Sequence, residues 1–80
     1  MNKLLDNMLN RLKDNDVRGM VVFMDDDDEV FSASTAQTKR DALRCLAYLT
    51  IDEARRQSAT VAEILDNVSK LAKTIEANGG

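Results

Sequence analysis

The residues best suited to binding or chemistry form an acidic run at positions 25–29. Its members are Asp25, Asp26, Asp27, Asp28 and Glu29. The formal charge of the whole chain is -3, so the acidic surplus is concentrated in this run. Five adjacent carboxylates repel one another. One interpretation is a surface that engages a basic site on a partner, including a site that normally holds nucleic acid. The other is a solvated turn whose charges keep a neighbouring apolar strand from aggregating.

The same carboxylates do not match the patterns expected of a metal site or a catalytic pair. A calcium loop starting at Asp25 needs Gly and Glu where the chain has Val30 and Ala36. Adjacent aspartates on a loop lack the fixed separation that paired-carboxylate catalysis requires. The chain has no His and a single cysteine, Cys45, which excludes an intramolecular disulfide and a closed zinc site. We therefore expect a non-enzymatic protein without a cofactor.

A second candidate site lies at the start of a predicted helix and would suit an anion. Its residues are Thr38, Lys39, Arg40 and Arg44. Backbone N–H groups at a helix start favour negative charge, so an oligomer that sequesters a nucleotide-like anion is the alternative function. In the plainer interpretation, Thr35 or Thr38 simply caps this helix.

The N-terminal segment predicts an amphipathic helix over about residues 3–14. Its apolar positions recur at helical spacing and are Leu4, Leu5, Met8, Leu9 and Leu12. Asp14, Asn15 and Asp16 follow, and such side chains compete for backbone hydrogen bonds and end helices.

Residues 17–35 predict an antiparallel hairpin. The run Met20–Met24 is continuously apolar, which indicates a strand buried on both faces. Val30–Ser34 mixes apolar and small polar residues and indicates a more exposed strand. No Asn-Gly or Asp-Gly pair joins them, so we expect a loop of about four residues, Asp25 to Asp28.

Two further helices are predicted, over about residues 38–57 and 61–77. Thr60 and Glu63 match a capping box that would start the second of these helices. A single helix over 38–77 stays open, because neither Gly nor Pro marks the junction. The last segment has the spacing of a helix seam, at Val61, Ile64, Leu65, Val68, Leu71, Ala72 and Ile75. Asn78, Gly79 and Gly80 would end it.

Together these elements predict one α+β domain over residues 1–80, in which the last two helices pack on the hairpin. A chain of 80 residues buries only a modest core, so we expect a homo-oligomer. No apolar run is long enough for a membrane span, and no secretory signal is visible, which favours a cytoplasmic protein. Direct nucleic-acid binding is not expected, since the chain has no basic excess and no Trp.

The sequence also resembles small acidic proteins encoded by bacteriophages. The resemblance covers about residues 11–57 and consists of a short amphipathic helix, RGMVVFM, an acidic turn, EVFSAS and an apolar helix. It implies a protein that binds a host or defence protein with a basic surface, such as an anti-CRISPR or another anti-defence inhibitor. It implies no catalytic residues.

Overall fold

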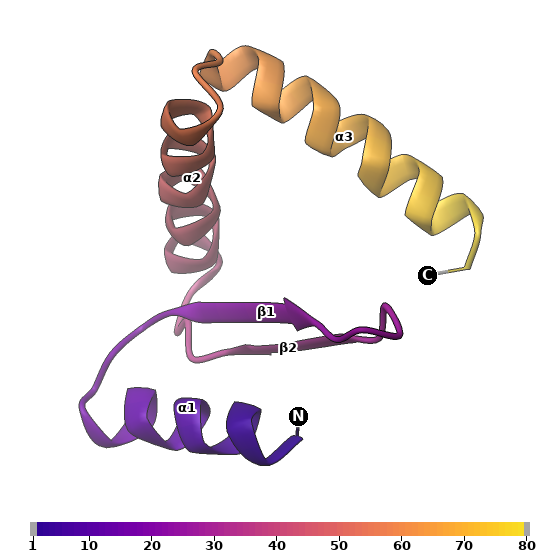
Figure 1. Ribbon diagram of the computed structural model, residues 1–80. Helices are drawn as coiled ribbons and strands as arrows, with labels where there is room; N and C mark the ends of the chain where they lie inside the picture. The colour runs from indigo at the N-terminus through magenta and orange to yellow at the C-terminus, as the bar shows by residue number, and fades with distance from the viewer. Residues whose placement is uncertain (1, 80) are drawn as a thin grey trace. The chain divides into compact units, whose positions relative to one another are not determined.

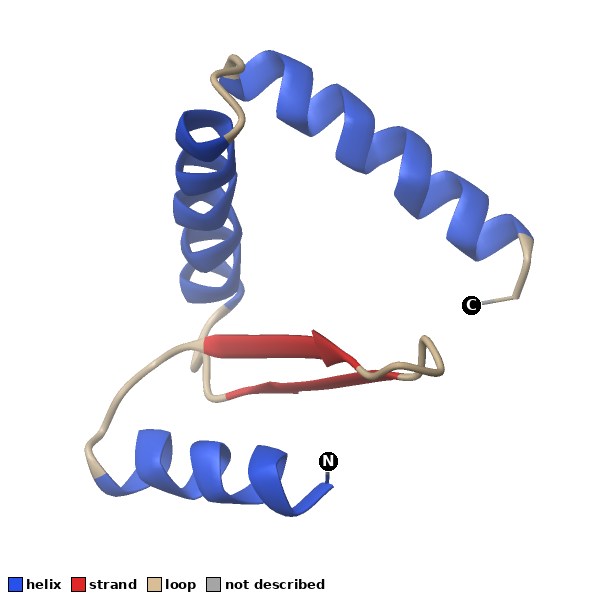
Figure 2. Cartoon of the chain, viewed as in Figure 1, coloured by secondary structure: helices blue, strands red, loops and turns tan. Residues whose placement is uncertain are grey.

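The computed structural model describes residues 2–79 and shows a helix, a hairpin and two more helices in chain order (Figure 1). The elements are α1 (Asn2–Asp14), β1 (Met20–Met24), β2 (Val30–Ser34), α2 (Lys39–Arg56) and α3 (Val61–Ala77). The strands form one antiparallel two-stranded sheet, drawn in red in Figure 2. The predicted α+β class and element order are confirmed, and the helix ends differ from those expected by no more than one residue.

Contacts group the chain into two compact units, Met1–Cys45 and Leu46–Gly80. The first contains α1, the hairpin and the start of α2, and the second contains the rest of α2 and α3. The boundary falls inside a continuous helix rather than in a linker. The single domain, and the packing of the last two helices on the hairpin, remain predictions.

In the first unit, the two faces of the sheet differ in exposure. Phe23 pairs with Phe31 and Val21 with Ala33, and all four residues are half-buried. The contact of α1 with β2 accounts for this burial. On the other face Val22, Met24 and Val30 are exposed. The expectation that β1 is buried on both faces is therefore wrong, because a sheet of two strands covered by one helix leaves one face open.

The apolar stripe of α1 behaves as its spacing predicts. Leu5, Met8, Leu9 and Leu12 are half-buried, whereas Leu4, in the first turn, is exposed. The helix ends in paired hydrogen bonds from Asp16 N–H to Lys13 O (3.1 Å) and from Val17 N–H to Leu12 O (2.8 Å). This is the Schellman arrangement, with Asp16 in left-handed backbone at φ 54°.

A threonine joins the two ends of the hairpin at its base. The hydroxyl of Thr35 accepts the N–H of Gly19 at 3.0 Å and donates to the carbonyl of Val17 at 2.7 Å. The N–H of Thr35 also donates to Gly19 O at 2.8 Å. Thr35 is therefore not a helix cap, and Thr38 takes that role by accepting the N–H of Asp41 at 3.0 Å.

An ion pair links the segment before β1 to the first turn of α2. Arg18 Nη1 lies 3.1 Å from Oδ1 and 3.0 Å from Oδ2 of Asp41. The Asp41 side chain is only 12% exposed. Removing Arg18 would leave a largely covered carboxylate without its partner, so within the first unit this pair holds the first turn of α2 to the segment before β1.

In the second unit, a tight turn separates α2 from α3, and residues 38–77 do not form one helix. Ser58 adopts φ 52°, and Ala59 N–H donates to Ala54 O at 2.8 Å. This is the same Schellman ending as that of α1, reached without glycine. Ala54 and Ile64, on either side of the turn, are the buried hydrophobic residues of the described chain.

The start of α3 confirms the predicted Thr60 cap. The Thr60 hydroxyl accepts the N–H of Glu63 at 3.1 Å and lies 3.1 Å from the Glu63 carboxylate, to which it donates. At the other end Asn78 caps the helix, and Gly79 follows in left-handed backbone at φ 77°. Gly80 lies outside the described residues.

Replacing Ser58 by Gly tests the strain at the α2–α3 turn. A Cβ in left-handed backbone costs about 1 kcal/mol or more, which exceeds what glycine loses in chain entropy. We expect Ser58→Gly to raise the free energy of unfolding by about 0.5 kcal/mol, measured by chemical denaturation. Ser58→Ala, which keeps the Cβ, is the control. An equal gain from both variants would contradict the explanation.

Candidate functional site

The acidic tip, residues 25–29, forms an ordered turn between β1 and β2. All five residues lie outside the strands, so the connection is one residue longer than expected. Asp28 N–H donates to Asp25 O at 3.0 Å, and Asp25 N–H donates to Glu29 O at 3.1 Å. Asp28 adopts φ 60°. Asp25 and Glu29 thus still pair through the backbone, which leaves residues 26–28 as the loop itself. A tight turn followed by a residue in left-handed backbone is typical of such three-residue hairpin loops.

Asp25 differs from its neighbours, because its carboxylate holds the turn together. Its Oδ1 accepts the N–H of Asp27 at 2.9 Å and the N–H of Glu29 at 3.0 Å. Asp25 is half-buried. Aspartate side chains stabilise turns in this way by taking the place of a backbone acceptor. Asp25 therefore holds the backbone of the tip in its turn.

The other four acidic residues point their charge to solvent. Asp26, Asp27, Asp28 and Glu29 are exposed. The ion pairs seen among residues 2–79 join Arg18 to Asp41, Arg56 to Glu53 and Lys70 to Asp66. Within those residues no cation of the chain pairs with the acidic tip. The structure thus presents four carboxylates free to meet a partner's positive charge.

Cation binding needs several of these carboxylates to converge, and the structure does not bring them together. Within residues 2–79, no three His, Cys, Asp or Glu side chains are placed to hold a metal ion. The side chains of a tight turn spread outward, whereas a calcium site draws six or more oxygens to one point.

The second candidate site, at the start of α2, is already used by the chain itself. The Thr38 hydroxyl accepts the N–H of Asp41 and so acts as a cap. The Asp41 carboxylate also lies in this first turn, where it pairs with Arg18. Lys39, Arg40 and Arg44 are exposed. A bound anion would meet these three cations but also the Asp41 carboxylate, so no observation favours this site.

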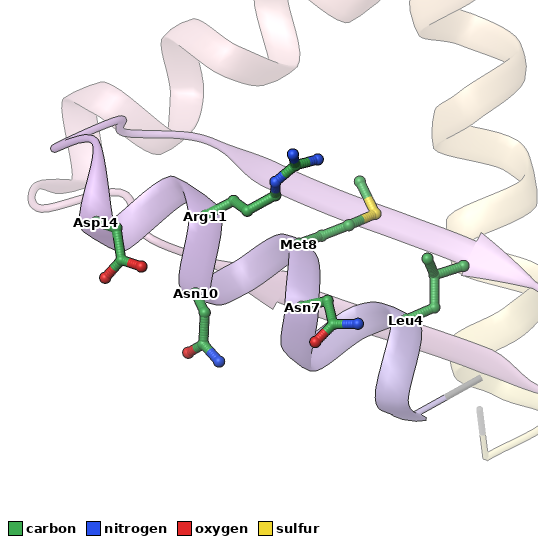
Figure 3. Close-up of a pocket in the computed structure, with 6 residues that line it drawn as sticks. All are labelled: Leu4, Asn7, Met8, Asn10, Arg11 and Asp14. Carbon is green, nitrogen blue, oxygen red and sulfur yellow. The ribbon is translucent and has the colours of Figure 1, made fainter.

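A shallow depression runs along α1, and sequence reasoning did not anticipate it (Figure 3). Its lining comes from this one helix: Leu4, Asn7, Met8, Asn10, Arg11 and Asp14. The close-up shows Asn10 and Asp14 pointing away from the side on which Met8 and Arg11 lie. A hollow lined by a single helix does not enclose a ligand, and its one carboxylate, that of Asp14, points away from Met8 and Arg11. No sequence signal marks it.

Near the end of α2, one carboxyl group has an altered acidity. Arg56 Nη1 donates to Glu53 at 2.8 Å and Gln57 Nε2 donates to the same carboxylate at 3.2 Å. These hydrogen bonds, first that of Arg56, lower the pKa of Glu53 from its usual value. These hydrogen bonds stabilise the ionised carboxylate of Glu53, which belongs to neither candidate site.

Comparison of the chain with models of known families, with curated proteins and with solved structures gave no match. In the described part of the chain, no helix has the length and apolar character needed to span a bilayer. The site must therefore be interpreted from its own geometry.

Replacing Asp25 by Ala should loosen the tip. The variant leaves two backbone N–H groups without their acceptor, and we expect a loss of about 1 kcal/mol in the free energy of unfolding, measured by denaturation. Asp26→Ala is the matched control, since Asp26 is exposed and its carboxylate does not hold the turn. Equal stabilities of the two variants would show that the Asp25 hydrogen bonds contribute nothing.

Proposed function

We propose that the chain is a non-enzymatic binding protein whose acidic tip engages a basic, nucleic-acid-handling surface of a partner protein. The observation that supports this proposal is the exposure of Asp26, Asp27, Asp28 and Glu29 on a turn that Asp25 fixes. By occupying the basic surface, the tip would lower its access to nucleic acid. The resemblance to phage proteins suggests a host or defence protein as the partner.

The spacing of charge on the tip supports a partner of this kind. Four successive residues of the tip each have an exposed carboxylate. A strand of duplex DNA likewise has one negative charge at every successive nucleotide. A basic surface that binds phosphates therefore has the charge needed to attract the tip.

The ordered turn adds to this electrostatic match. A flexible acidic segment loses conformational freedom when it binds, and that loss weakens the complex. Here the hydrogen bonds of Asp25 fix the backbone before any partner arrives. The charges are also free of partners within residues 3–79, so binding does not first require an internal ion pair to break.

The protective interpretation of the tip also has an observation in its favour. Met24 and Val30 pair beside the tip, and both are exposed, as is Val22 on the same face. Charges next to an exposed apolar strand hinder edge-to-edge association. The same carboxylates can guard this face, and aggregation of variants measures that role separately from binding.

Neutralising the exposed charges tests the proposal. The variant changes Asp26, Asp27 and Asp28 to Asn and Glu29 to Gln, and it spares Asp25 to keep the turn. Asn also tolerates the left-handed backbone at position 28. Affinity capture from a bacterial lysate with wild type first identifies the partner. Binding kinetics with that partner then compare the two proteins, and we expect the association rate of the variant to be lower than that of wild type by at least about tenfold at low salt. Added salt should weaken the wild-type complex in the same way.

A matched control changes the same amount of charge elsewhere on the chain. It converts Asp6, Asp14, Asp16 and Asp52 to Asn; these are exposed residues outside the ion pairs, and Asn tolerates the left-handed backbone at position 16. The control should bind as wild type does. A partner retained equally by the tip variant would contradict the proposal, and aggregation of that variant with unchanged binding would favour the protective role.

A further inference from the structure

The α3 helix exposes an apolar stripe along its whole length. Its large members are Val61, Leu65, Val68, Leu71 and Ile75, and their exposed fractions range from 43% to 63%. Ile64 lies beside the same stripe and is buried within its own chain. Exposed apolar side chains that line one helix face mark a surface which packs against another element.

The second unit has little core of its own. It runs from Leu46 to Gly80, and the buried hydrophobic side chains among the described residues are those of Ala54 and Ile64. Small folds gain stability when a further apolar surface is covered. Pairing of two copies through the stripe would supply that cover.

The pattern of the stripe suits pairing with a second copy of α3 that runs antiparallel to the first. Its exposed apolar positions are symmetric about Val68: they lie three and seven residues to each side of it. Reversing the helix therefore places apolar residues opposite apolar residues, with Val61 of one copy near Ile75 of the other. An interface that repeats itself under a two-fold rotation is what a symmetric dimer requires.

The charges of α3 are placed where they do not oppose this pairing. Asp66 and Lys70 form an ion pair at 2.9 Å and, at 3.6 residues per turn, lie on the side of the helix opposite the stripe. The positions that flank the stripe include Asn67, Ser69 and Thr74, which are uncharged. Two identical copies thus meet without like charges along most of the seam.

One charge next to the stripe favours antiparallel pairing of two α3 helices over parallel pairing. Glu76 lies beside it in the last turn of α3. Parallel copies would bring two Glu76 side chains together, whereas antiparallel copies hold them at opposite ends. Antiparallel helices also place the positive end of one helix dipole beside the negative end of the other.

We infer that α3 is the self-association surface of this protein, and that two copies pair through the stripe with their α3 helices antiparallel. The inference concerns a surface apart from the acidic tip and does not depend on the proposed function. A dimer formed in this way would have two tips.

Analytical ultracentrifugation of the full chain, from about 1 µM to about 1 mM, tests the inference. Wild type should approach twice the 8.9 kDa mass of one chain as concentration rises. Val68→Glu places a charge in the middle of the stripe and should raise the dissociation constant at least about 100-fold. Ala77→Glu adds the same charge on the opposite side and should leave it unchanged.

Circular dichroism confirms that each variant stays helical. Should Val68→Glu unfold, the milder Val68→Ala should still weaken the dimer about tenfold. A wild type that is monomeric at every concentration would overturn the inference, and would indicate that the chain covers the stripe itself. A dimer unaffected by both Val68 variants would overturn it too, because another surface would then form the contact.

Mixing variants tests the direction. Val61→Glu and Ile75→Lys should each weaken the homodimer, and their mixture should form a heterodimer if the helices are antiparallel. A mixture of Val61→Glu with Val61→Lys should not regain association. Recovery in the second mixture alone would show a parallel pair and overturn the proposed arrangement.

Discussion

Three reversals of the chain depend on non-glycine residues in left-handed backbone: Asp16, Asp28 and Ser58. Each stands where the chain must stop one element and redirect itself, after α1, at the acidic tip and after α2. L-residues adopt this conformation at a cost, so neighbouring hydrogen bonds must hold each of them in place. Among the hydrophobic residues of the described chain, only Ala54 and Ile64 are buried. These local hydrogen bonds therefore matter more to the fold than they would in a domain with a larger core.

The parts of the fold that sequence could predict are those governed by periodicity and by caps. The spacing of Leu5, Met8, Leu9 and Leu12 located α1, and the Thr60 and Glu63 pair located the start of α3. Both signals involve residues within a few helical turns of one another, so they can be recognised without knowledge of the rest of the chain. The position of the acidic tip followed in the same way, from the apolar runs on either side of it.

Features that depend on distant residues or on backbone angles escaped prediction. Thr35 and Thr38 are both candidate caps by residue type and position, and only the return of the chain past Gly19 shows that Thr35 closes the hairpin. The end of α2 was ambiguous because Ser58 gives no glycine signal for its turn. The separate role of Asp25 within five similar acidic residues follows from turn geometry alone. Burial of β1 on one face depends on how many elements cover the sheet, which no residue of β1 encodes.

The hairpin is fastened at both ends, by Thr35 at its base and by Asp25 at its tip. A slip of one strand by a single residue would move the phenylalanine of that strand, Phe23 or Phe31, to the solvent face. Because hydrogen bonds hold both ends, neither strand can shift its register unless the bonds of Thr35 or those of Asp25 break first. The hairpin is therefore a ribbon closed at both ends, and a force applied to its tip is shared between its two strands.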